Sequence, residues 1–599
     1  MRSTVSTELP FDPDELRNKY REERDKRLRA DGNEQYVEIV GEFAHFLDDP
    51  YCDPDTRQPH KGETDVAIIG GGFGGLLMGA RLREQGIANF KIIEKGGDFG
   101  GTWYWNRYPG AACDVESYIY LPLLEEMGFM PASKYTPAPE ILDHCRRIGN
   151  HFDLYPRAMF QTEVLGMNWD DSDRRWVIRT NRGDEIRARF VCMANGPLHR
   201  PKLPGIPGVG TFEGHSFHTS RWDYEYTGGT SEGGLTGLAD KVVGIIGTGA
   251  TAVQCVPHLG EGAKHLYVFQ RTPSSIDVRN NTPTDPAWAA SLQPGWQRRR
   301  LENFTNLTSG AFDTEDLVQD GWTEIVGNLL LRARREGGLG TDPSQIGQIV
   351  EIADFEKMEQ IRTRVDAVIK DPTTAEALKP WYRQFCKRPC FHDDYLPTFN
   401  RANVTLVDTE GKGVEAITPK GVVANGKEYE LDCLIYATGF EVGTDYTRRS
   451  GYEVTGRNGI TLTEKWSGGI STYQGFYSRD FPNCFIISIA QSGVSVNFPH
   501  MLNEQAIHLA HLLKHVTDNN ITLVETSEKA ESDWVRTIVE NSTMNLKYLE
   551  ACTPGYYNNE GRPAERAAQN GGYGKGPVNF VRMLEAWRAA GDFAGLEMA

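Results

Sequence analysis

The chain has 599 residues, of which 39% are hydrophobic, 64 are basic and 82 are acidic, so its net charge is −18. That length exceeds what a single core usually supports, and the negative charge argues against nucleic acid or an anionic membrane as the main partner. No stretch approaches the roughly 20 apolar residues that cross a bilayer, and the N-terminus is charged where a signal peptide is apolar. We therefore expect a cytoplasmic protein of several domains, without membrane insertion, that works as a monomer or homodimer.

An N-terminal extension, residues 1–61, precedes the first predicted strand. Its segment from Asp14 to Arg29 carries dense charge of both signs, with Leu16, Tyr20 and Leu28 as its few apolar points. This pattern predicts a largely solvated helix that lies on the body of the protein.

The first strong motif is a glycine fingerprint that follows the apolar run Val66–Ile69 and opens a helix. In that context glycines allow a tight turn and a close backbone approach to a pyrophosphate, which then lies at the helix N-terminus. The next strand, Phe90–Ile93, ends at Glu94, placed 24 residues after Gly70 as expected for the ribose ligand of FAD or NAD. The dinucleotide ligands predicted in the fingerprint itself are Gly70, Gly72, Phe73 and Gly75.

A second fingerprint follows the apolar run Val242–Ile246. The residue at the corresponding strand end is Arg271, 24 residues after Gly247, and its planar cation suits a 2′-phosphate, as does the neighbouring Thr272. We therefore expect NADPH here and FAD at the first fingerprint; the alternative for Arg271 is a solvated charge at a strand end. The ligands predicted in this second fingerprint are Gly247, Thr248, Gly249, Ala250 and Thr251.

The remaining pattern predicts an α/β fold with two Rossmann-like dinucleotide-binding domains. Alternating residues from Phe160 to Val191 indicate antiparallel hairpins, and helical stretches at Trp322–Arg335 and Ile349–Val368 indicate a helical insertion. The expected division is an FAD domain at 62–200 and 438–599, an NADP domain at 201–275 and 387–437, and the insertion at 276–386.

Ten cysteines are scattered without a Cys-x-x-Cys pair. They predict neither a disulfide framework nor a structural zinc site, and we interpret them as small buried residues. Cys386, Cys390 and His392 come nearest to a cluster but lack a fourth ligand, so no metal is expected. Cys113 stands alone after the first fingerprint, which argues against a flavoprotein disulfide reductase.

A third motif lies between the fingerprints and consists of Phe212, Gly214, His218, Trp222 and Asp223, which we call the signature residues. Three further motifs are Gly100-Gly101-Thr102-Trp103, Tyr108-Pro109-Gly110 with Asp114, and Ala437-Thr438-Gly439-Phe440. With these motifs the chain resembles the type I Baeyer–Villiger monooxygenases from about residue 62 onward.

The resemblance implies that NADPH reduces FAD, that the reduced flavin captures O2 as a C4a-peroxide, and that this attacks a ketone to give an ester or lactone. It assigns Arg388 as the catalytic cation, Asp114 as its orienting partner and Lys387 as a further NADPH phosphate contact. The residues alone would favour a surface cation at Arg388. Further cofactor contacts implied by the family are Gly101, Thr102, Trp103, Asp114, Tyr120 and Val164.

The resemblance leaves two features open. The signature residues lie on a predicted linker, so we interpret them as conformational, although a buried structural histidine would explain His218 equally well. Where many members carry a tryptophan against the nicotinamide ribose, this chain has Thr553–Asn559, in which Tyr556 or Tyr557 could replace it. This ending and the N-terminal extension resemble the subgroup that acts on macrocyclic and polycyclic ketones, which implies a large hydrophobic ketone as substrate.

Two other functions compete with this interpretation. A flavin monooxygenase that oxidises nitrogen or sulfur shares the fold and both cofactors, but Trp222-Asp223 and Arg388 argue against it. A non-catalytic NADPH-sensing protein would leave two intact cofactor sites and a matching arginine without a purpose.

Overall fold

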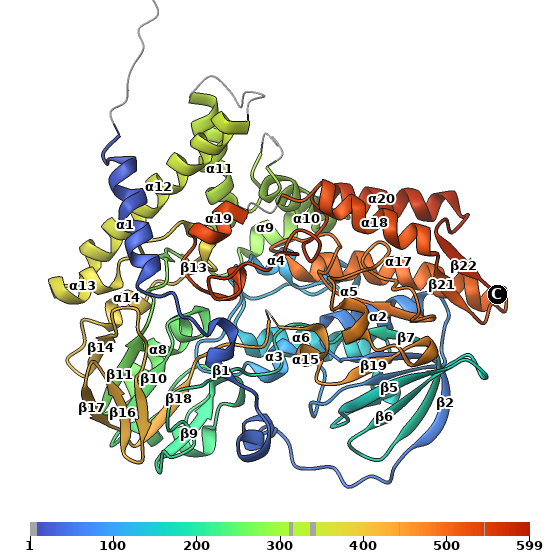
Figure 1. Ribbon diagram of the computed structural model, residues 1–599, viewed down its shortest axis with the longest axis horizontal. Coiled ribbons are helices and arrows are strands. Elements are labelled where there is room, and N and C mark those ends of the chain that lie inside the picture. Colours follow the sequence, from blue (N-terminus) through green and yellow to red (C-terminus); the bar gives the residue numbers. More distant parts are fainter. Residues whose placement is uncertain (1–8, 311–314, 336–342, 443, 544–545) are drawn as a thin grey trace, which may run out of the picture.

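Two sheets, a mixed one and a parallel one, each covered by helices, form the body of the protein (Figure 1). The computed structural model describes residues 9–310, 315–335, 343–442, 444–543 and 546–599. The larger sheet is eight-stranded, with order β19-β5-β6-β7-β2-β3-β4 and β20 beside β7. Its strands are β2 (Lys61–Ile69), β3 (Phe90–Ile93), β4 (Ala158–Met159), β5 (Val164–Asp170), β6 (Arg175–Thr180), β7 (Glu185–Met193), β19 (Glu453–Thr455) and β20 (Cys484–Ile486).

The smaller sheet is five-stranded, with order β14-β11-β10-β18-β9, and all its pairs are parallel. Each nucleotide fingerprint follows a central strand, β2 in the larger sheet and β10 in the smaller, so the turn after each strand opens toward the carboxyl edge of its sheet. The strands of the smaller sheet are β9 (His215–His218), β10 (Val242–Ile246), β11 (His265–Gln270), β14 (Val404–Asp408) and β18 (Cys433–Tyr436).

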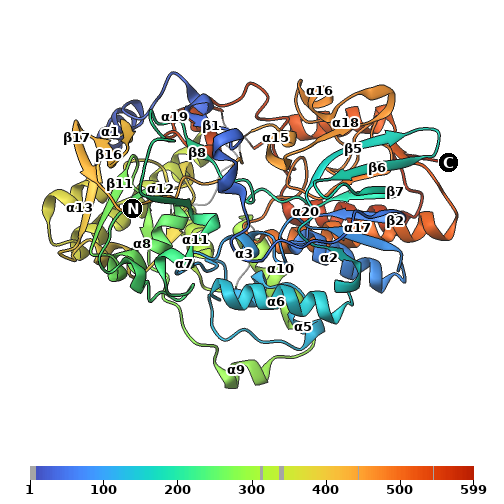
Figure 2. The same cartoon turned by 90° about the horizontal axis from the view of Figure 1, so that it is seen from below.

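Helices cover both sheets, as apolar parallel strands require. The first fingerprint helix, α2 (Phe73–Glu84), packs against α6 (Ala138–His151) and α17 (Phe498–Asp518) (Figure 2). The second, α8 (Ala250–Gly262), lies along the smaller sheet. The antiparallel hairpins predicted between Phe160 and Val191 are present as β5, β6 and β7.

The predicted helical region between the sheets contains five helices among its described residues. In Figure 1 α11 and α12 stand above the smaller sheet, whereas α9 and α10 lie near the middle of the molecule; α11 and α12 contain the two stretches read from the sequence. These helices are α9 (Pro286–Ser291), α10 (Trp296–Thr308), α11 (Gly321–Arg335), α12 (Pro343–Val368) and α13 (Pro372–Leu378).

The N-terminal extension packs on the body of the protein. Its helix α1 (Pro13–Asp25) is shorter than the predicted segment, and its buried Leu16 and Tyr20 pack with Phe355 of α12. Leu28 lies beyond the helix and is exposed. Farther along, β1 (Tyr36–Val37) pairs with β8 (Leu203–Pro204), which brings the extension to the edge of the cavity described below.

The remaining helices, strands and 3-10 turns fall into two groups. Those bearing on the site are α3 (Thr102–Trp105), α4 (Ser117–Tyr120), α7 (Tyr224–Thr227), β12 (Ile276–Asp277), β13 (Cys390–Phe391) and η8 (Tyr556–Asn558). The others are α5 (Leu124–Met127), α14 (Tyr395–Thr398), β15 (Ala416–Thr418), β16 (Gly421–Ala424), β17 (Lys427–Glu430), α15 (Tyr446–Ser450), α16 (Leu462–Trp466), β21 (Val524–Thr526), α18 (Glu528–Glu540), α19 (Leu546–Ala551), α20 (Pro577–Ala590), β22 (Leu596–Met598) and the 3-10 turns η1 (Gly32–Gln35), η2 (Gly41–Leu47), η3 (Tyr155–Arg157), η4 (Thr219–Arg221), η5 (Thr236–Leu238), η6 (Gln384–Cys386) and η7 (Arg457–Gly459).

The interpretation of every cysteine as a small buried thiol is wrong for two of them. Cys386 and Cys552 form a disulfide across 166 residues of sequence. No Cys-x-x-Cys pattern could have indicated it, because the fold brings together two segments that are distant along the chain. The bond joins the segment before Arg388 to the C-terminal loop, residues 552–562.

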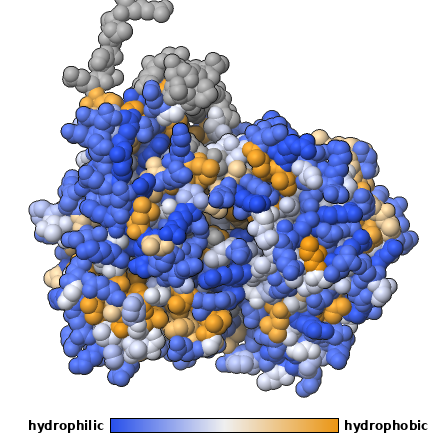
Figure 3. All heavy atoms as spheres, viewed as in Figure 1, coloured by the Kyte–Doolittle hydropathy of each residue, from blue (hydrophilic) through white to orange (hydrophobic). Residues whose placement is uncertain are grey.

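The surface is mostly hydrophilic on the face shown in Figure 3, where hydrophobic residues form small separate groups. Within the described ranges, every helix is either too short or too polar to span a bilayer.

The disulfide predicts a thiol count. Eight cysteines are free in the structure. Titration with a thiol reagent in denaturant should therefore find eight thiols in the untreated protein and all ten after reduction. Ten thiols before reduction would show that Cys386 and Cys552 are not joined.

Candidate active site

A large cavity lies between the two sheets and is reached by both glycine fingerprints. Its volume is about 2050 Å³, whereas pockets for a single drug-sized ligand run from about 300 to 1,000 Å³. The N-terminal extension, the C-terminal loop and the segment before β13 also contribute to its lining. The cavity therefore has room for more than one large ligand.

The first fingerprint is shaped to admit a dinucleotide. Gly70 has a φ of 107°, which other residues rarely adopt, and a Cβ on Gly75 would come within 1.8 Å of the Gly70 carbonyl oxygen. Gly75 thus allows the helix to approach the strand and lies behind the cavity wall. Both Glu94 carboxylate oxygens accept backbone hydrogen bonds, one from Gly71 and one from Gly96, each at 2.6 Å. Burial raises the pKa of Glu94, and these two bonds oppose that effect.

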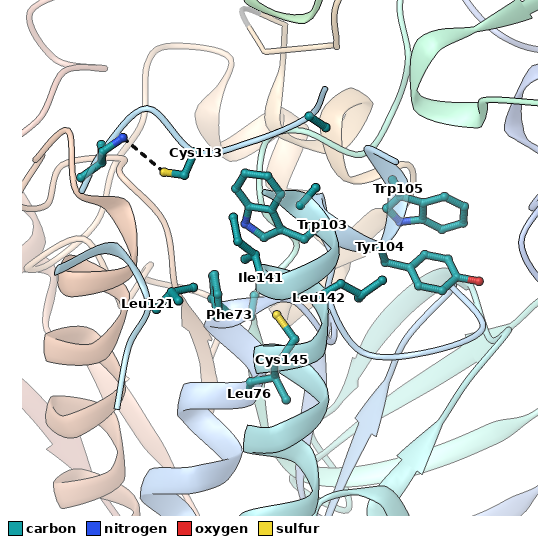
Figure 4. Close-up of a cluster of buried hydrophobic side chains, with 14 of the residues drawn as sticks. Phe73, Leu76, Trp103, Tyr104, Trp105, Cys113, Leu121, Ile141, Leu142 and Cys145 are labelled. Carbon is teal, nitrogen blue, oxygen red and sulfur yellow. Dashed lines mark hydrogen bonds between the residues drawn. The ribbon is translucent and has the colours of Figure 1, made fainter. Parts of the chain in front are cut away.

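Aromatic side chains form the wall beside the first fingerprint (Figure 4). Trp103 and Phe73 both contact Tyr120 there, and the indole Nε1 of Trp103 donates to the Tyr120 hydroxyl at 3.1 Å. Phe73 lies edge-on to the Tyr120 ring, with centroids 6.1 Å apart. Since a buried indole N–H and a phenol satisfy each other, the remaining surface toward the cavity is apolar and flat, which suits a planar ring system.

The second fingerprint faces a cluster of cations. Arg271 follows β11, and burial together with the Arg271 charge lowers the pKa of Lys387 to about 8. The Thr272 hydroxyl is buried without a hydrogen-bond partner among the described residues. Two cations and a free hydroxyl at the end of this strand fit a nucleotide phosphate.

Arg388 and Asp114 form the central ion pair of the cavity. The Arg388 guanidinium donates to the Asp114 carboxylate at 2.6 Å, and 42% of the arginine side chain is accessible, facing the cavity. The Asp114 charge raises the pKa of Arg388 well above its usual value, so the cation is permanent. Each residue lies on a loop, Asp114 between α3 and α4 and Arg388 just before β13.

Three aromatic residues around Arg388 complete this site. Trp322, from α11, donates from its Nε1 to the Asp114 backbone oxygen at 3.1 Å, and the guanidinium of Arg388 lies 5.8 Å from its ring centroid. Sequence reasoning missed Trp322, because 208 residues separate it from Asp114. Tyr556 and Tyr557 come from the C-terminal loop, line the cavity and interact electrostatically with Arg388.

The signature residues lie away from the cavity. His218 is fully buried, bonded through Nδ1 to Ser220 at 2.8 Å, and burial lowers its pKa to about 3, so it is neutral. Trp222 is fully buried, and its Nε1 donates to Thr227 of α7. Asp223 caps α7 and bonds His215, while Phe212 fills the space beside Gly214. These contacts connect β9 to α7.

The structure brings most of the sequence-predicted site residues together. None of the signature residues, all of them described, borders the cavity, and Gly75 lies behind it. Those that line it are Gly70, Gly72, Phe73, Glu94, Gly101, Thr102, Trp103, Asp114, Tyr120, Val164, Gly247, Thr248, Gly249, Ala250, Thr251, Arg271, Thr272, Lys387 and Arg388.

Comparison with known proteins places this site in a family. Residues 67–283 match the model for pyridine nucleotide-disulphide oxidoreductases. The chain is 57% identical to neopentalenolactone D synthase of Streptomyces avermitilis, over 98% of this chain and 99% of that protein. It is 52% identical to Baeyer-Villiger monooxygenase ATR8 of Stachybotrys chlorohalonatus, over 99% and 95%. The solved polycyclic ketone monooxygenase of Thermothelomyces thermophila superimposes with a TM-score of 0.90 at 38% identity, over 98% and 99%.

Two dinucleotide sites that open into one cavity define a flavoprotein oxidoreductase that also uses a nicotinamide nucleotide. With relatives this similar over nearly its whole length, the chain belongs to the Baeyer–Villiger monooxygenase family. The expected α/β fold and the family resemblance are both confirmed.

The buried Glu94 carboxylate predicts a stability effect. In Glu94→Gln one oxygen is replaced by an NH2 group that faces a backbone N–H, so one buried donor loses its acceptor. The free energy of unfolding should fall by about 1–3 kcal/mol. Chemical denaturation of the flavin-free protein measures it, with Glu163→Gln, which also lines the cavity, as the matched control. Equal stability of the two variants would contradict the assignment of both backbone bonds to Glu94.

Proposed function

We propose that this chain is a Baeyer–Villiger monooxygenase that converts bulky polycyclic ketones into lactones or esters, with FAD and NADPH as cofactors. The observation that carries the proposal is the Arg388–Asp114 pair, which faces a cavity shared by both nucleotide fingerprints. The names of the relatives, which include a polycyclic ketone monooxygenase, support the same substrate class.

The two fingerprints divide the cofactors. We assign FAD to the β2–α2 turn. Glu94 would support this glycine turn, and Trp103, Phe73 and Tyr120 would border the flavin ring system. NADPH is assigned to the β10–α8 turn, where Arg271, Thr272 and Lys387 would hold its 2′-phosphate. We keep the domain division predicted from sequence, with the larger sheet in the FAD domain and the smaller one in the NADP domain.

The reaction balances as ketone, O2, NADPH and a proton giving ester or lactone, NADP⁺ and water. One oxygen atom of O2 enters a C–C bond beside the carbonyl and the other leaves as water, with NADPH supplying two electrons. FAD, when bound, takes up those electrons and activates the oxygen.

Arg388 supplies the charge that this reaction needs. As a ketone carbonyl is attacked, negative charge develops on its oxygen, and a fixed cation beside it lowers the barrier. Asp114 holds the guanidinium in place, and Trp322 fixes the loop of Asp114 through its backbone oxygen. Since 42% of the Arg388 side chain still faces the cavity, the cation stays available to a substrate.

The lining of the cavity supports a large hydrophobic substrate. Its volume of about 2050 Å³ includes both nucleotide sites and exceeds what a single ligand usually occupies. Exposed Val496 and half-buried Leu502 add apolar surface to this lining. Tyr556 and Tyr557 cover the region of Arg388, and we propose that one of them contacts the nicotinamide ribose. A polycyclic hydrocarbon skeleton suits such a lining.

Replacement of Arg388 separates the two halves of the reaction. Arg388→Ala should leave reduction of the flavin by NADPH possible but lower lactone formation by at least about a hundredfold, as for the loss of a preorganised oxyanion donor. Anaerobic stopped-flow reduction and product analysis measure the two steps. Arg388→Lys is the matched control that keeps the charge. Lactone formation by the alanine variant at near the original rate would refute the role of this cation.

Lys387 predicts a pH dependence of nucleotide binding. Its pKa is lowered to about 8, so the ammonium is charged at pH 7 and neutral at pH 9, whereas a 2′-phosphate is ionised throughout. The Kd for NADP⁺ should rise several-fold from pH 7 to 9 and that for NAD⁺ should not. Isothermal calorimetry on the FAD-loaded protein measures both, and Lys387→Met should remove the difference. Parallel profiles for the two nucleotides would exclude Lys387 from the phosphate site.

A further inference from the structure

The guanidinium assigned to the 2′-phosphate already has an anionic partner. Arg271 donates from one terminal nitrogen to Gln35 at 2.6 Å and from the other to the carboxylate of Glu560 at 3.1 Å. The second carboxylate oxygen of Glu560 accepts from the Tyr36 hydroxyl at 3.1 Å. Gln35 and Tyr36 come from the N-terminal extension and Glu560 from the C-terminal loop, so segments from opposite ends of the chain meet on Arg271.

The carboxylate of Glu560 is buried and is fixed by an unusual backbone conformation. Its side chain is 4% exposed, although it lies on a loop that borders the cavity. Asn559, Glu560 and Gly561 are all in the left-handed region, with φ of 53°, 56° and 86°. For a glutamate this conformation is unfavourable, and it persists only where contacts compensate. Here the Glu560 backbone N–H donates to the Gly555 oxygen at 2.9 Å, and the carboxylate bonds Arg271 and Tyr36.

A 2′-phosphate and this carboxylate compete for the same cation. Each would accept hydrogen bonds from the terminal nitrogens of Arg271, and two anions within a few ångströms in a half-buried site repel each other strongly. Gln35 is neutral and can remain beside a bound phosphate. Glu560 therefore has to move away from Arg271. If it stays, the phosphate binds Arg271 more weakly.

We propose that Glu560 is a specificity-determining residue for the nucleotide, an internal anion on the C-terminal loop that a 2′-phosphate displaces from Arg271. The inference rests on the proposed role of Arg271 in NADPH binding. It adds that NADP(H), but not NAD(H), breaks the Arg271–Glu560 pair. Binding of NADP(H) therefore includes the free-energy cost of displacing Glu560, which binding of NAD(H) does not. Glu560 thereby reduces the difference in affinity between the two nucleotides.

The displacement reaches the reaction centre through the C-terminal loop. Cys552 is tied to Cys386 at one end of this loop, and Glu560 is tied to Arg271 near the other. Tyr556 and Tyr557, which line the same cavity as Arg388, lie between these two attachments. Loss of the Glu560 contact removes one attachment of this loop, while the disulfide and the bonds of Asn559 to Asn33 and of Arg562 to the Ala30 oxygen remain. The two tyrosines are therefore released in part when a 2′-phosphate is bound.

The test compares nucleotide affinities in Glu560→Gln. Isothermal calorimetry on the FAD-loaded protein gives the Kd of NADP⁺, NAD⁺, 2′,5′-ADP and 5′-AMP. We expect about tenfold tighter binding of NADP⁺ and 2′,5′-ADP than in the parent protein, as for the removal of one competing ion pair, with NAD⁺ and 5′-AMP changed less than about twofold. The matched control is Glu565→Gln, which removes the same charge from the same cavity lining.

Unchanged or weaker binding of NADP⁺ and 2′,5′-ADP to Glu560→Gln would overturn the proposal. Equal tightening in Glu565→Gln would do the same, because it would indicate a general charge effect. If Glu560→Gln does not fold, Tyr36→Phe releases one carboxylate oxygen without a change of charge and should tighten NADP⁺ binding by a smaller factor; no change would contradict the proposal.

A separate variant distinguishes an error in the role of Glu560 from an error in the proposed NADPH site. Arg271→Ala should weaken NADP⁺ much more than NAD⁺ if Arg271 holds the 2′-phosphate. An equal effect on both nucleotides would refute that site, whereas a selective loss with no response in Glu560→Gln would refute only the role of Glu560. Hydrogen exchange of the peptide containing residues 553–562 supplies a second readout: it should increase with NADP⁺ and not with NAD⁺.

Discussion

The ion pair between Arg388 and Asp114 is the contact on which the rest of the site depends. It joins a loop that follows the helical insertion to a loop that follows the first fingerprint, so it can form only when the two nucleotide units are correctly placed. Trp322 reinforces it from the insertion. Because an arginine stays charged at any working pH, the site has a constant positive potential where negative charge develops.

The sequence predicted the local parts of this protein well. An apolar strand, a glycine turn and a helix are consecutive in the chain, so both fingerprints, Glu94 and Arg271 could be placed without tertiary information. The contacts that sequence reasoning missed are long-range: Trp322 with Asp114 across 208 residues, Glu560 with Arg271 across 289 and Cys386 with Cys552 across 166. No periodicity encodes such pairings. Arg388 itself was found through family resemblance alone.

Both ends of the chain contribute to nucleotide binding in this account. The N-terminal extension is anchored by α1 on α12 and by β1 on β8. At the start of β1 it presents Gln35 to Arg271 and Tyr36 to Glu560. The C-terminal loop presents Glu560 to the same cation and its tyrosines to Arg388. A nucleotide phosphate is thereby linked to the reaction centre through covalently connected residues, which gives binding a physical means of influencing the later steps.

The most direct test of the central claim uses isotopic oxygen. The FAD-loaded protein is given NADPH, 18O2 and a steroid ketone such as progesterone, with cyclohexanone and a thioether as comparisons, and the products are analysed by mass spectrometry. The account predicts an ester or lactone of the steroid that contains one 18O atom for each NADPH consumed. Oxidation of the thioether without any oxygen insertion into a ketone would contradict it and favour a heteroatom monooxygenase.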